Sequence, residues 1–164
     1  MSLEVRIGTE EDVPAILNII NHEILNSTSV YDYEPKTIEE QLDWFTDRKK
    51  NDFPVIVAVE NGEVLGYGSF GTFRQKAGYK FCVEHSIYIN EKARGKGIGK
   101  RLLTELINIA KASGMHTMVA GIDSSNTGSM IFHEQFGFIK AGTLKEVGHK
   151  FDTWLDVTFM QLIL

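Results

Sequence analysis

Apolar residues recur along the chain with two different periods, and these periods predict the order of its helices and strands. Residues 3–8 (LEVRIG) alternate as a strand does, whereas residues 13–24 repeat apolar side chains at helical spacing, behind a capping box at residues 9–12 (TEED). A second capping box at residues 37–40 (TIEE) opens another helix. Two apolar runs within residues 55–71 flank Asn61-Gly62, a pair that favours a type I′ turn, so this segment is predicted to form a β-hairpin.

The second half of the chain continues the alternation of elements. Residues 81–90 are predicted to form a strand, 98–113 a helix closed by Gly114, 117–123 a buried strand, 126–137 a short helix, and 138–144 and 154–164 two closing strands. Trp154 and Asp156 are expected in the core. The order β-α-α-β-β-β-α-β-α-β-β predicts an α/β (α+β) fold, a mixed sheet with helices on both faces. No repeat or linker is present, so residues 1–164 are expected to form a single domain.

A glycine-rich segment joins the strand at residues 81–90 to the following helix. We call residues 94–99 (RGKGIG) the glycine loop. Glycines let backbone N–H groups approach an anion closely, and a helix N-terminus adds unpaired N–H groups, so the loop is predicted to bind phosphate. A nucleotide P-loop would need Ser or Thr where Arg101 stands, and a Rossmann fingerprint would need wider glycine spacing in a first βαβ unit. Neither pattern fits.

The charge of the chain narrows the choice of ligand. The net charge is −5 and the pI about 5.5, which argues against nucleic acid or an anionic membrane as a partner. Basic residues gathered around one loop of an acidic protein instead indicate a small anionic ligand. Cys82 is the only cysteine, and neither an export signal nor a run of about 18 apolar residues occurs, so a cytoplasmic location is expected.

The glycine loop fits the pattern R/Q-x-x-G-x-G/A, and in it the chain resembles the GCN5-related N-acetyltransferase (GNAT) superfamily. A second signature, N-x-x-[AS]-x-x-x-Y-E-K-x-G-F, matches at Asn126, Ser129, Glu134, Gly137 and Phe138, with His133 in place of tyrosine. That departure is similar to the branch that acetylates phosphinothricin, methionine sulfoximine and methionine sulfone. Residues 21–37, 66–89 and 147–162 also resemble this branch.

The resemblance implies a fold, a co-substrate and a set of binding residues. The sheet is expected to have about seven mostly antiparallel strands and to splay between the fourth and fifth. Acetyl-CoA is the expected co-substrate, with its diphosphate on the glycine loop and its pantetheine arm along the preceding strand. By family analogy a homodimer is expected. The residues expected to bind acetyl-CoA are Ile87, Tyr88, Ile89, Arg94, Gly95, Lys96, Gly97, Ile98, Gly99, Asn126 and Ser129.

Glu84 is the candidate general base. An amino-acid ammonium is mostly protonated near neutral pH, so a carboxylate must take its proton before the amine attacks a thioester. Strand alternation puts Ser86 and Tyr88 on the same face as Glu84, and His85 and Ile87 on the other. A charge in an otherwise apolar strand is costly unless it has a function or a partner. The alternative is therefore a salt-bridged structural glutamate.

The other chemical roles are less fixed by the sequence. His133 stands where the superfamily has its tyrosine acid, so it is a candidate to protonate the leaving thiolate; it could instead orient the acetyl group or cap a packed helix. The backbone N–H of Ile87 or Tyr88 is expected to hold the oxyanion, where a β-bulge would splay the strand. Cys82 could act as a covalent nucleophile, but it lacks a neighbouring helix N-terminus and is interpreted as a packing residue. Without H-E-x-x-H or C-x-x-C, no metal is expected.

The acceptor is expected near the end of the hairpin. Arg74 could hold a carboxylate, sulfoximine or phosphinate oxygen in bidentate fashion, and Phe73 and Tyr31 could wall the methyl end. The branch commonly has Trp where Phe73 stands, which implies a wider pocket. The leading hypothesis is acetylation of the α-amine of a small amino-acid analogue. A peptide or protein acetylase and a non-catalytic acyl-CoA-binding module are the alternatives.

Overall fold

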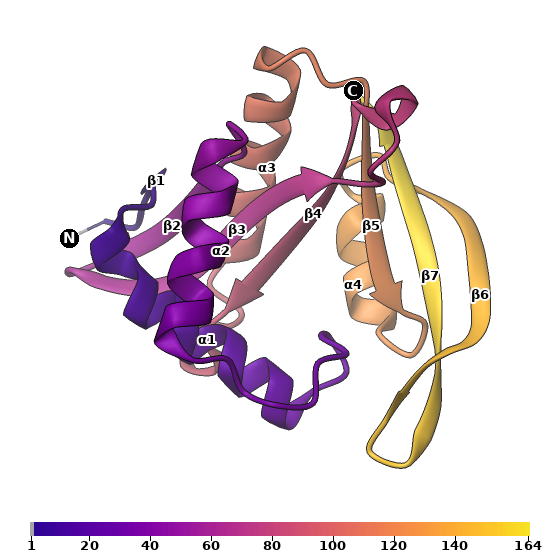
Figure 1. The fold of residues 1–164 in the computed structure, drawn as a ribbon, viewed down its shortest axis with the longest axis horizontal. Helices are drawn as coiled ribbons and strands as arrows, with labels where there is room; N and C mark the ends of the chain where they lie inside the picture. Colours follow the sequence, from indigo (N-terminus) through magenta and orange to yellow (C-terminus); the bar gives the residue numbers. More distant parts are fainter. Residues whose placement is uncertain (1) are drawn as a thin grey trace.

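A single seven-stranded sheet runs through the computed structural model, which describes residues 2–164 (Figure 1). The strand order is β1-β2-β3-β4-β5-β7-β6, and every neighbouring pair is antiparallel except β4 and β5. This confirms the mixed, mostly antiparallel sheet expected from the sequence. The strands are β1 (Glu4–Ile7), β2 (Val55–Glu60), β3 (Glu63–Thr72), β4 (Cys82–Ile89), β5 (Thr117–Asp123), β6 (Ile139–Lys150) and β7 (Thr153–Ile163).

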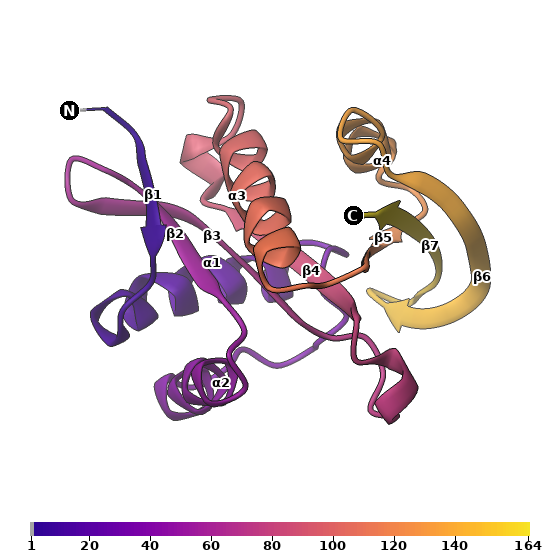
Figure 2. The same ribbon diagram turned by 90° about the horizontal axis from the view of Figure 1, so that it is seen from above.

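Helices cover both faces of this sheet. Helices α1 (Val13–Asn26) and α2 (Ile38–Lys50) lie on one face, and α3 (Ile98–Ala112) and α4 (Thr127–Glu134) lie on the other, as Figure 2 shows. Three short 3-10 helices, η1 (Glu10–Asp12), η2 (Ala77–Tyr79) and η3 (Glu91–Ala93), sit in the connections. The apolar face of α3 packs in one core cluster, and α1 and α2 pack in a second one across the sheet.

The local signals read from the sequence are confirmed. Thr37 accepts a hydrogen bond from the Glu40 N–H at 3.2 Å, and the Glu40 carboxylate accepts one from the Thr37 N–H at 2.7 Å, so the capping box opens α2. Asn61 and Gly62 have φ of 52° and 80°, as a type I′ turn requires between β2 and β3. These features depend on neighbours in the sequence, which is why the sequence alone predicts them.

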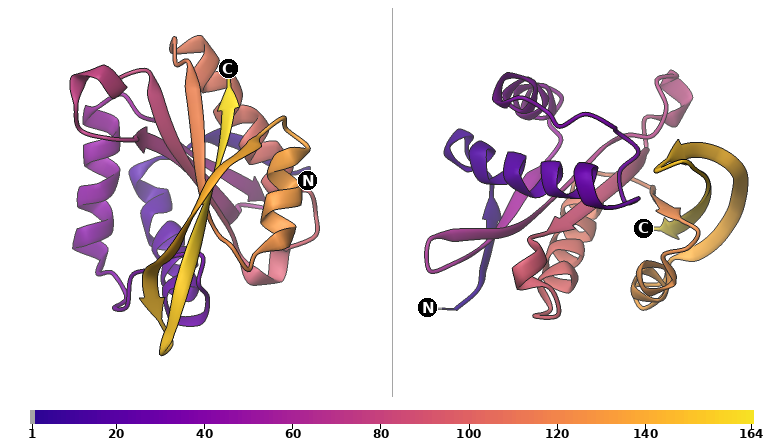
Figure 3. Two further views of the ribbon diagram at one scale, coloured as in Figure 1. Left: turned by 90° about the vertical axis from the view of Figure 1, so that its right-hand side faces the viewer. Right: turned by 90° about the horizontal axis from the view of Figure 1, so that it is seen from below.

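The sheet opens between β4 and β5. Only three residue pairs join the two strands, and the last of them is Glu84 with Val119. Beyond this point the ribbons diverge, and we call the opening the fork (Figure 1). The expected bulge in β4 is absent, because β3 and β4 keep one continuous register from Gly66 to Thr72. Instead β5 stays paired with β7 along its whole length and turns away with β6 and α4 as one unit (Figure 3).

The closing hairpin differs from the sequence-based expectation. Strand β6 runs on to Lys150, and the turn falls at Phe151 and Asp152, which both have positive φ. Trp154 is 64% exposed, so its expected place in the core is wrong; it packs on the His149 ring beside the turn. Asp156 is also outside the core clusters. Its carboxylate accepts from Lys145 at 2.8 Å and from the Glu146 N–H at 2.8 Å. The β6–β7 ribbon extends beyond the helices, so a strand pattern there does not imply burial.

Candidate active site

The fork contains a cleft of about 880 Å³ that reaches both faces of the sheet. Glu23 and Ser27, at the end of α1, contribute from one face, and α4 contributes from the other; the edges of β4 and β5 form the walls between them. The cleft therefore connects the side where an acceptor could enter with the side where the glycine loop lies. The predicted residues that line it are Ile87, Tyr88, Ile89, Arg94, Gly95, Gly99, Asn126, Ser129 and His133.

The glycine loop has the geometry of an anion site. Gly95 and Gly97 have φ of +79° and +76°, and no atom lies within 4 Å of the position that a Cβ would take at either residue. Gly97 is the N-cap of α3 and offers no side-chain cap, so the first N–H groups of the helix face the loop without a side-chain partner. The side chain of Ile98 is 2% exposed in the core, so only its backbone is available to a ligand. The loop fits a diphosphate.

The edge of β4 beyond Glu84 offers backbone groups to a ligand. In the part of the chain that the structure describes, β5 pairs with β4 only as far as Glu84, so residues 85–89 have no strand partner on that side. Backbone groups at a strand edge favour an extended chain that carries amides. Ile87, Tyr88 and Ile89 thus lie where the pantetheine arm was expected.

Sequence reasoning missed Glu23, which is 4% exposed in α1. Its carboxylate is ion-paired with Arg94 of the glycine loop and accepts from the Ser27 hydroxyl at 2.7 Å. The ion pair ties α1 to the loop across the mouth of the cleft. A signal was available, because Glu23 interrupts the apolar stripe of Ile16, Ile20 and Ile24. A buried carboxylate on such a stripe needs a cationic partner.

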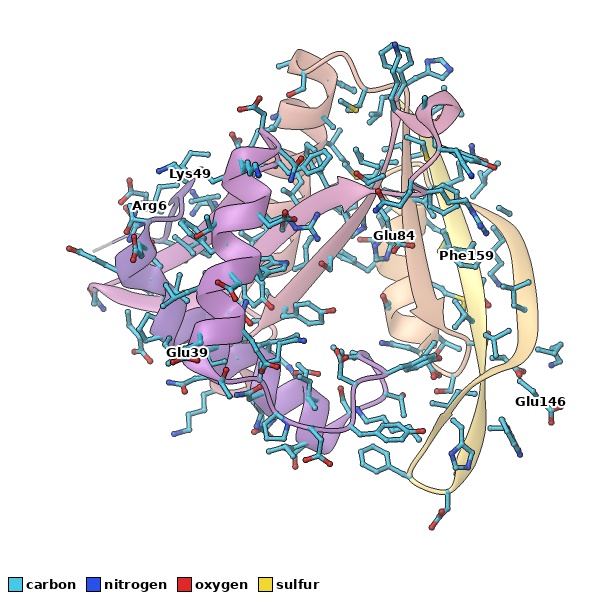
Figure 4. The ribbon with its side chains drawn as sticks, in the orientation of Figure 1. Arg6, Glu39, Lys49, Glu84, Glu146 and Phe159 are labelled. Carbon is cyan, nitrogen blue, oxygen red and sulfur yellow. The ribbon has the colours of Figure 1, made fainter. Side chains whose placement is uncertain are left out.

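Glu84 marks the closed end of the fork (Figure 4). Its Oε2 atom lies 3.6 Å from the position that a Cβ would take at Gly121 of β5, so the carboxylate extends over the diverging strand. Glu84 is exposed, and no ion pair with Glu84 occurs among residues 2–164, so the salt-bridged alternative has no observed partner. Partial burial raises the pKa of Glu84, and the positive charge of Arg48 partly offsets this increase.

The two faces of β4 follow the predicted alternation. Tyr88 packs in the cluster of α1 and α2, whereas Val83 packs in the cluster of α3, and Ile87 lies against it.

Cys82 is half-buried, and burial raises the pKa of its thiol. A raised pKa keeps the thiol protonated, which disfavours the nucleophile interpretation.

His133 and His85 meet in the lining of the cleft, a contact that the sequence did not indicate. The two Nε2 atoms are 2.9 Å apart, and the His133 Nδ1–H donates to the Ser129 carbonyl at 2.7 Å. Since Nδ1 carries the proton of neutral His133, its Nε2 accepts from His85. Both nitrogens of His133 are thereby engaged, and the buried Nδ1 of His85 has no partner among residues 2–164. Burial, with a smaller effect of His133, lowers the pKa of His85 to about 3.

The residues expected to bind the acceptor lie outside this cleft lining. Tyr31 donates from its hydroxyl to the Asp123 carboxylate at 3.0 Å, which links the segment after α1 to the end of β5. Phe73 directly follows β3, and its ring centroid is 6.0 Å from that of Tyr79. Arg74 is exposed, with its Cζ 5.5 Å from the centroid of the Phe73 ring. Phe73 and Arg74 thus stand at the Glu84 end of the fork.

Residues 2–164 contain neither a cluster of metal-ligating side chains nor a membrane-spanning helix. No group of three or more His, Cys, Asp or Glu side chains lies close enough together to hold a metal ion. Within the same range, no helix has the length and apolar content needed to cross a bilayer.

Comparison with known proteins identifies the family. The model of the acetyltransferase (GNAT) family matches residues 19–138, more than half of the chain. The chain belongs to the GNAT family. An L-methionine sulfoximine/L-methionine sulfone acetyltransferase from Pseudomonas aeruginosa is 42% identical over 165 residues, and the match covers 100% of this chain and 96% of that protein. The GNAT fold and the N-acetyltransferase activity expected from the sequence are therefore confirmed.

Solved structures of GNAT proteins agree with the fold. A phosphinothricin acetyltransferase from Sinorhizobium meliloti in complex with acetyl-CoA superimposes with a TM-score of 0.96 at 36% identity, covering 100% of this chain and 89% of that one. A ribosomal-protein-alanine N-acetyltransferase from Brucella melitensis gives a TM-score of 0.97 at 42% identity, covering 98% and 99%. Among relatives of similar sequence identity, some are therefore named for small-molecule acceptors and one for a protein acceptor.

Proposed function

We propose that this GNAT acetyltransferase transfers the acetyl group of acetyl-CoA to the α-amine of a small amino-acid analogue of the methionine sulfoximine, methionine sulfone or phosphinothricin type. The observation that carries the proposal is the unpaired Glu84 carboxylate at the closed end of the fork. The names of the relatives support the acceptor class. The biological effect would be detoxification of such analogues in the cytoplasm.

The chain's own residues would hold acetyl-CoA in three places. The glycine loop and the N-terminus of α3 would bind the diphosphate, and the free edge of β4 would pair with the pantetheine arm. Asn126 caps α4 through its side-chain oxygen, which accepts from the Ser129 N–H at 3.0 Å, so its amide NH₂ remains available to the ligand. Acetyl-CoA supplies an acyl group that is already activated as a thioester, so no protein nucleophile is needed.

Glu84 would act as the general base. Its carboxylate would accept the proton of the acceptor ammonium, directly or through a water, and leave the amine free to attack. A raised pKa brings the base closer to the working pH and makes it a stronger proton acceptor. A backbone N–H of Ile87 or Tyr88 would donate to the oxygen on which negative charge develops.

His133 would orient the acetyl group rather than supply a proton. Its hydrogen bonds to Ser129 and His85 support this role among the three alternatives, because an acid would need an N–H aimed into the cleft. Protonating the thiolate from His133 would require the bond with His85 to break first.

The far end of the acceptor would lie against Phe73 and Arg74. The Arg74 guanidinium is exposed and could hold sulfoximine or phosphinate oxygens. Tyr31 would limit the length of the acceptor, since its ring is fixed against Gly148 and Asp123. No metal is assigned to the reaction.

The enzyme would work as a homodimer through the β6–β7 ribbon. This ribbon exposes large apolar side chains on an edge of the sheet, which is otherwise a liability in water. They are Ile139, Leu144, Val147, Trp154 and Ile163.

The decisive experiment measures release of the CoA thiol against a panel of amines. The panel contains methionine sulfoximine, methionine sulfone, phosphinothricin, common amino acids, polyamines and short peptides. We expect turnover of the first three. Turnover confined to peptides would favour the protein-acetylase alternative. The name of the Brucella melitensis relative points to a protein acceptor for that alternative. Binding of acetyl-CoA without turnover of any amine would favour a non-catalytic module.

A further inference from the structure

Arg48 holds its guanidinium against the sheet, and no ion pair engages it among residues 2–164. It lies in the last turn of α2, half-buried, with its Cζ 5.7 Å from the centroid of the Trp44 ring and 6.0 Å from that of the Phe53 ring. No ion pair or side-chain hydrogen bond to Arg48 occurs in the described range, residues 2–164. A partly desolvated cation with unused donors is costly, so it is best explained by a partner that arrives with a ligand.

Gly71 is what allows Arg48 to reach this position. A Cβ at Gly71 would stand 1.4 Å from the Arg48 Nη1 atom and 2.6 Å from its Cζ, so any other residue would displace the guanidinium. The hairpin strand β3 therefore has a gap in its side-chain row, and the tip of Arg48 fills it. Gly71 is buried, so the guanidinium covers this part of the sheet.

The same gap sets Arg48 beside Glu84. Gly71 and Glu84 are directly paired across β3 and β4, so their side-chain positions share one face of the sheet. Directly opposed Cβ positions lie about 4.5–5.5 Å apart, which puts Nη1 of Arg48 within about 7 Å of the Cβ of Glu84. An unpaired guanidinium and an unpaired carboxylate thus stand side by side at the closed end of the fork.

We propose that Arg48 binds the α-carboxylate of the acceptor while Glu84 takes the proton from its α-amine. An α-amino acid carries its ammonium and carboxylate on one carbon, so the two groups match an adjacent anion and cation. A guanidinium binds a carboxylate through two parallel N–H donors. This inference rests on the proposed function and deepens it: Arg48 selects α-amino acids over plain amines, and Arg74 is left for the oxygens at the far end.

The test compares two acceptors that differ only at this group, methionine sulfone and its α-carboxamide. Arg48→Met should raise the KM for methionine sulfone about 10- to 100-fold, as loss of a charge-assisted hydrogen-bonded pair does, and change the KM for the carboxamide less than about twofold. Lys49→Met is the matched control, because Lys49 is the exposed neighbouring cation on α2 and should leave both values unchanged (Figure 4).

A second variant tests the geometry with the charge retained. Gly71→Ala puts a methyl group where Nη1 now lies, and the flexible end of Arg48 can move aside without unfolding the chain. We expect the same selective rise in KM for methionine sulfone. An equal loss on both acceptors in both variants would mean that Arg48 only packs α2, and unchanged kinetics would mean that the carboxylate binds elsewhere. Either result overturns the inference.

Calorimetry separates this inference from the proposed function. Methionine sulfone is titrated into wild type and Arg48→Met, each loaded with CoA, so the readout needs no turnover. If wild type binds the ligand but acetylates no amino acid, the proposed function fails, and loss of binding in Arg48→Met would still support Arg48 as the carboxylate site. If wild type acetylates methionine sulfone and Arg48→Met binds it equally well, only the inference about Arg48 fails. Absence of binding to wild type overturns both.

Discussion

The Nε2 atom of His85 lies 2.9 Å from the Nε2 atom of His133, and only one of the two can carry a proton in that contact. The Ser129 carbonyl fixes the proton of His133 on Nδ1, so His85 is the donor. Protonation of His133 at Nε2 would place two donors face to face, and protonation of His85 at its unpartnered Nδ1 would leave a charge on a buried ring. Burial lowers the pKa of both histidines, and the pair is therefore neutral in the folded protein.

This pair should make the fold sensitive to acid. The pKa of His85 is about 3 in the folded chain and about 6.5 when unfolded, so below pH 6.5 the unfolded state takes up a proton that the folded state refuses. The contribution of His85 to the free energy of unfolding is therefore present above pH 6.5. It is lost as the pH falls below 6.5, by about 1.4 kcal/mol per pH unit.

His85→Gln keeps an N–H for His133 but cannot titrate. Urea unfolding at pH 7.5 and 5.5 should therefore show a loss of stability about 1 kcal/mol smaller in the variant than in wild type. His116→Gln, at an exposed histidine, is the control and should lose as much as wild type. Equal losses in all three proteins would show that the pair is not held neutral.

Glu84→Gln should remove the base and preserve its shape. We expect kcat to fall by about 100-fold or more at pH 7, as loss of a general base does, with KM for acetyl-CoA unchanged. In wild type, activity should fall as the pH drops through the raised pKa of Glu84, because the ionised form accepts the proton. The pH–activity profile of the variant should lack this fall at low pH, which we call the acid limb. Glu39→Gln, at an exposed carboxylate on α2, serves as the control, and full activity of Glu84→Gln at neutral pH would eliminate Glu84 as the base (Figure 4).

Arg48 should also set the position of that acid limb. Its positive charge lowers the pKa of Glu84 and so works against the effect of burial. Arg48→Met should therefore move the acid limb of kcat to higher pH, whereas Lys49→Met should leave it in place. The α-carboxamide acceptor is used here, so that loss of carboxylate binding does not obscure the shift. A limb that stays at the wild-type pH would mean that the two charges are too well screened to interact.

The β6–β7 ribbon should hold the proposed dimer together. Trp154→Ser removes a large exposed apolar side chain from this ribbon and should shift the protein from dimer toward monomer in sedimentation velocity. Phe81→Ser removes a side chain that is 53% exposed just before β4, and should leave the dimer intact. A wild-type protein that sediments as a monomer across micromolar concentrations would refute the dimer itself.

Local sequence signals predicted much of the fold, and their limits are physical. Asn61-Gly62 and the capping box at Thr37 act through near neighbours, so the sequence alone predicts them. The contact of His85 with His133 joins residues 48 positions apart, and only the packing of α2 on the sheet brings Arg48 over Gly71. The alternation of apolar and polar residues shows that a strand has two different faces. It does not show whether a helix covers either face.

The glycine loop gives a sharp test of acetyl-CoA binding. Gly97 has φ of +76°, a left-handed conformation that costs an L-residue about 1–2 kcal/mol, and it caps α3 where the diphosphate would lie. Gly97→Ala should raise the KM for acetyl-CoA about 10-fold or more while leaving the KM for the acceptor unchanged, because its methyl group would enter the space of the ligand. Gly78→Ala is the matched control, since Gly78 also has open space around it but no positive φ. Equal KM values for the two variants would show that the diphosphate is held by the basic side chains alone.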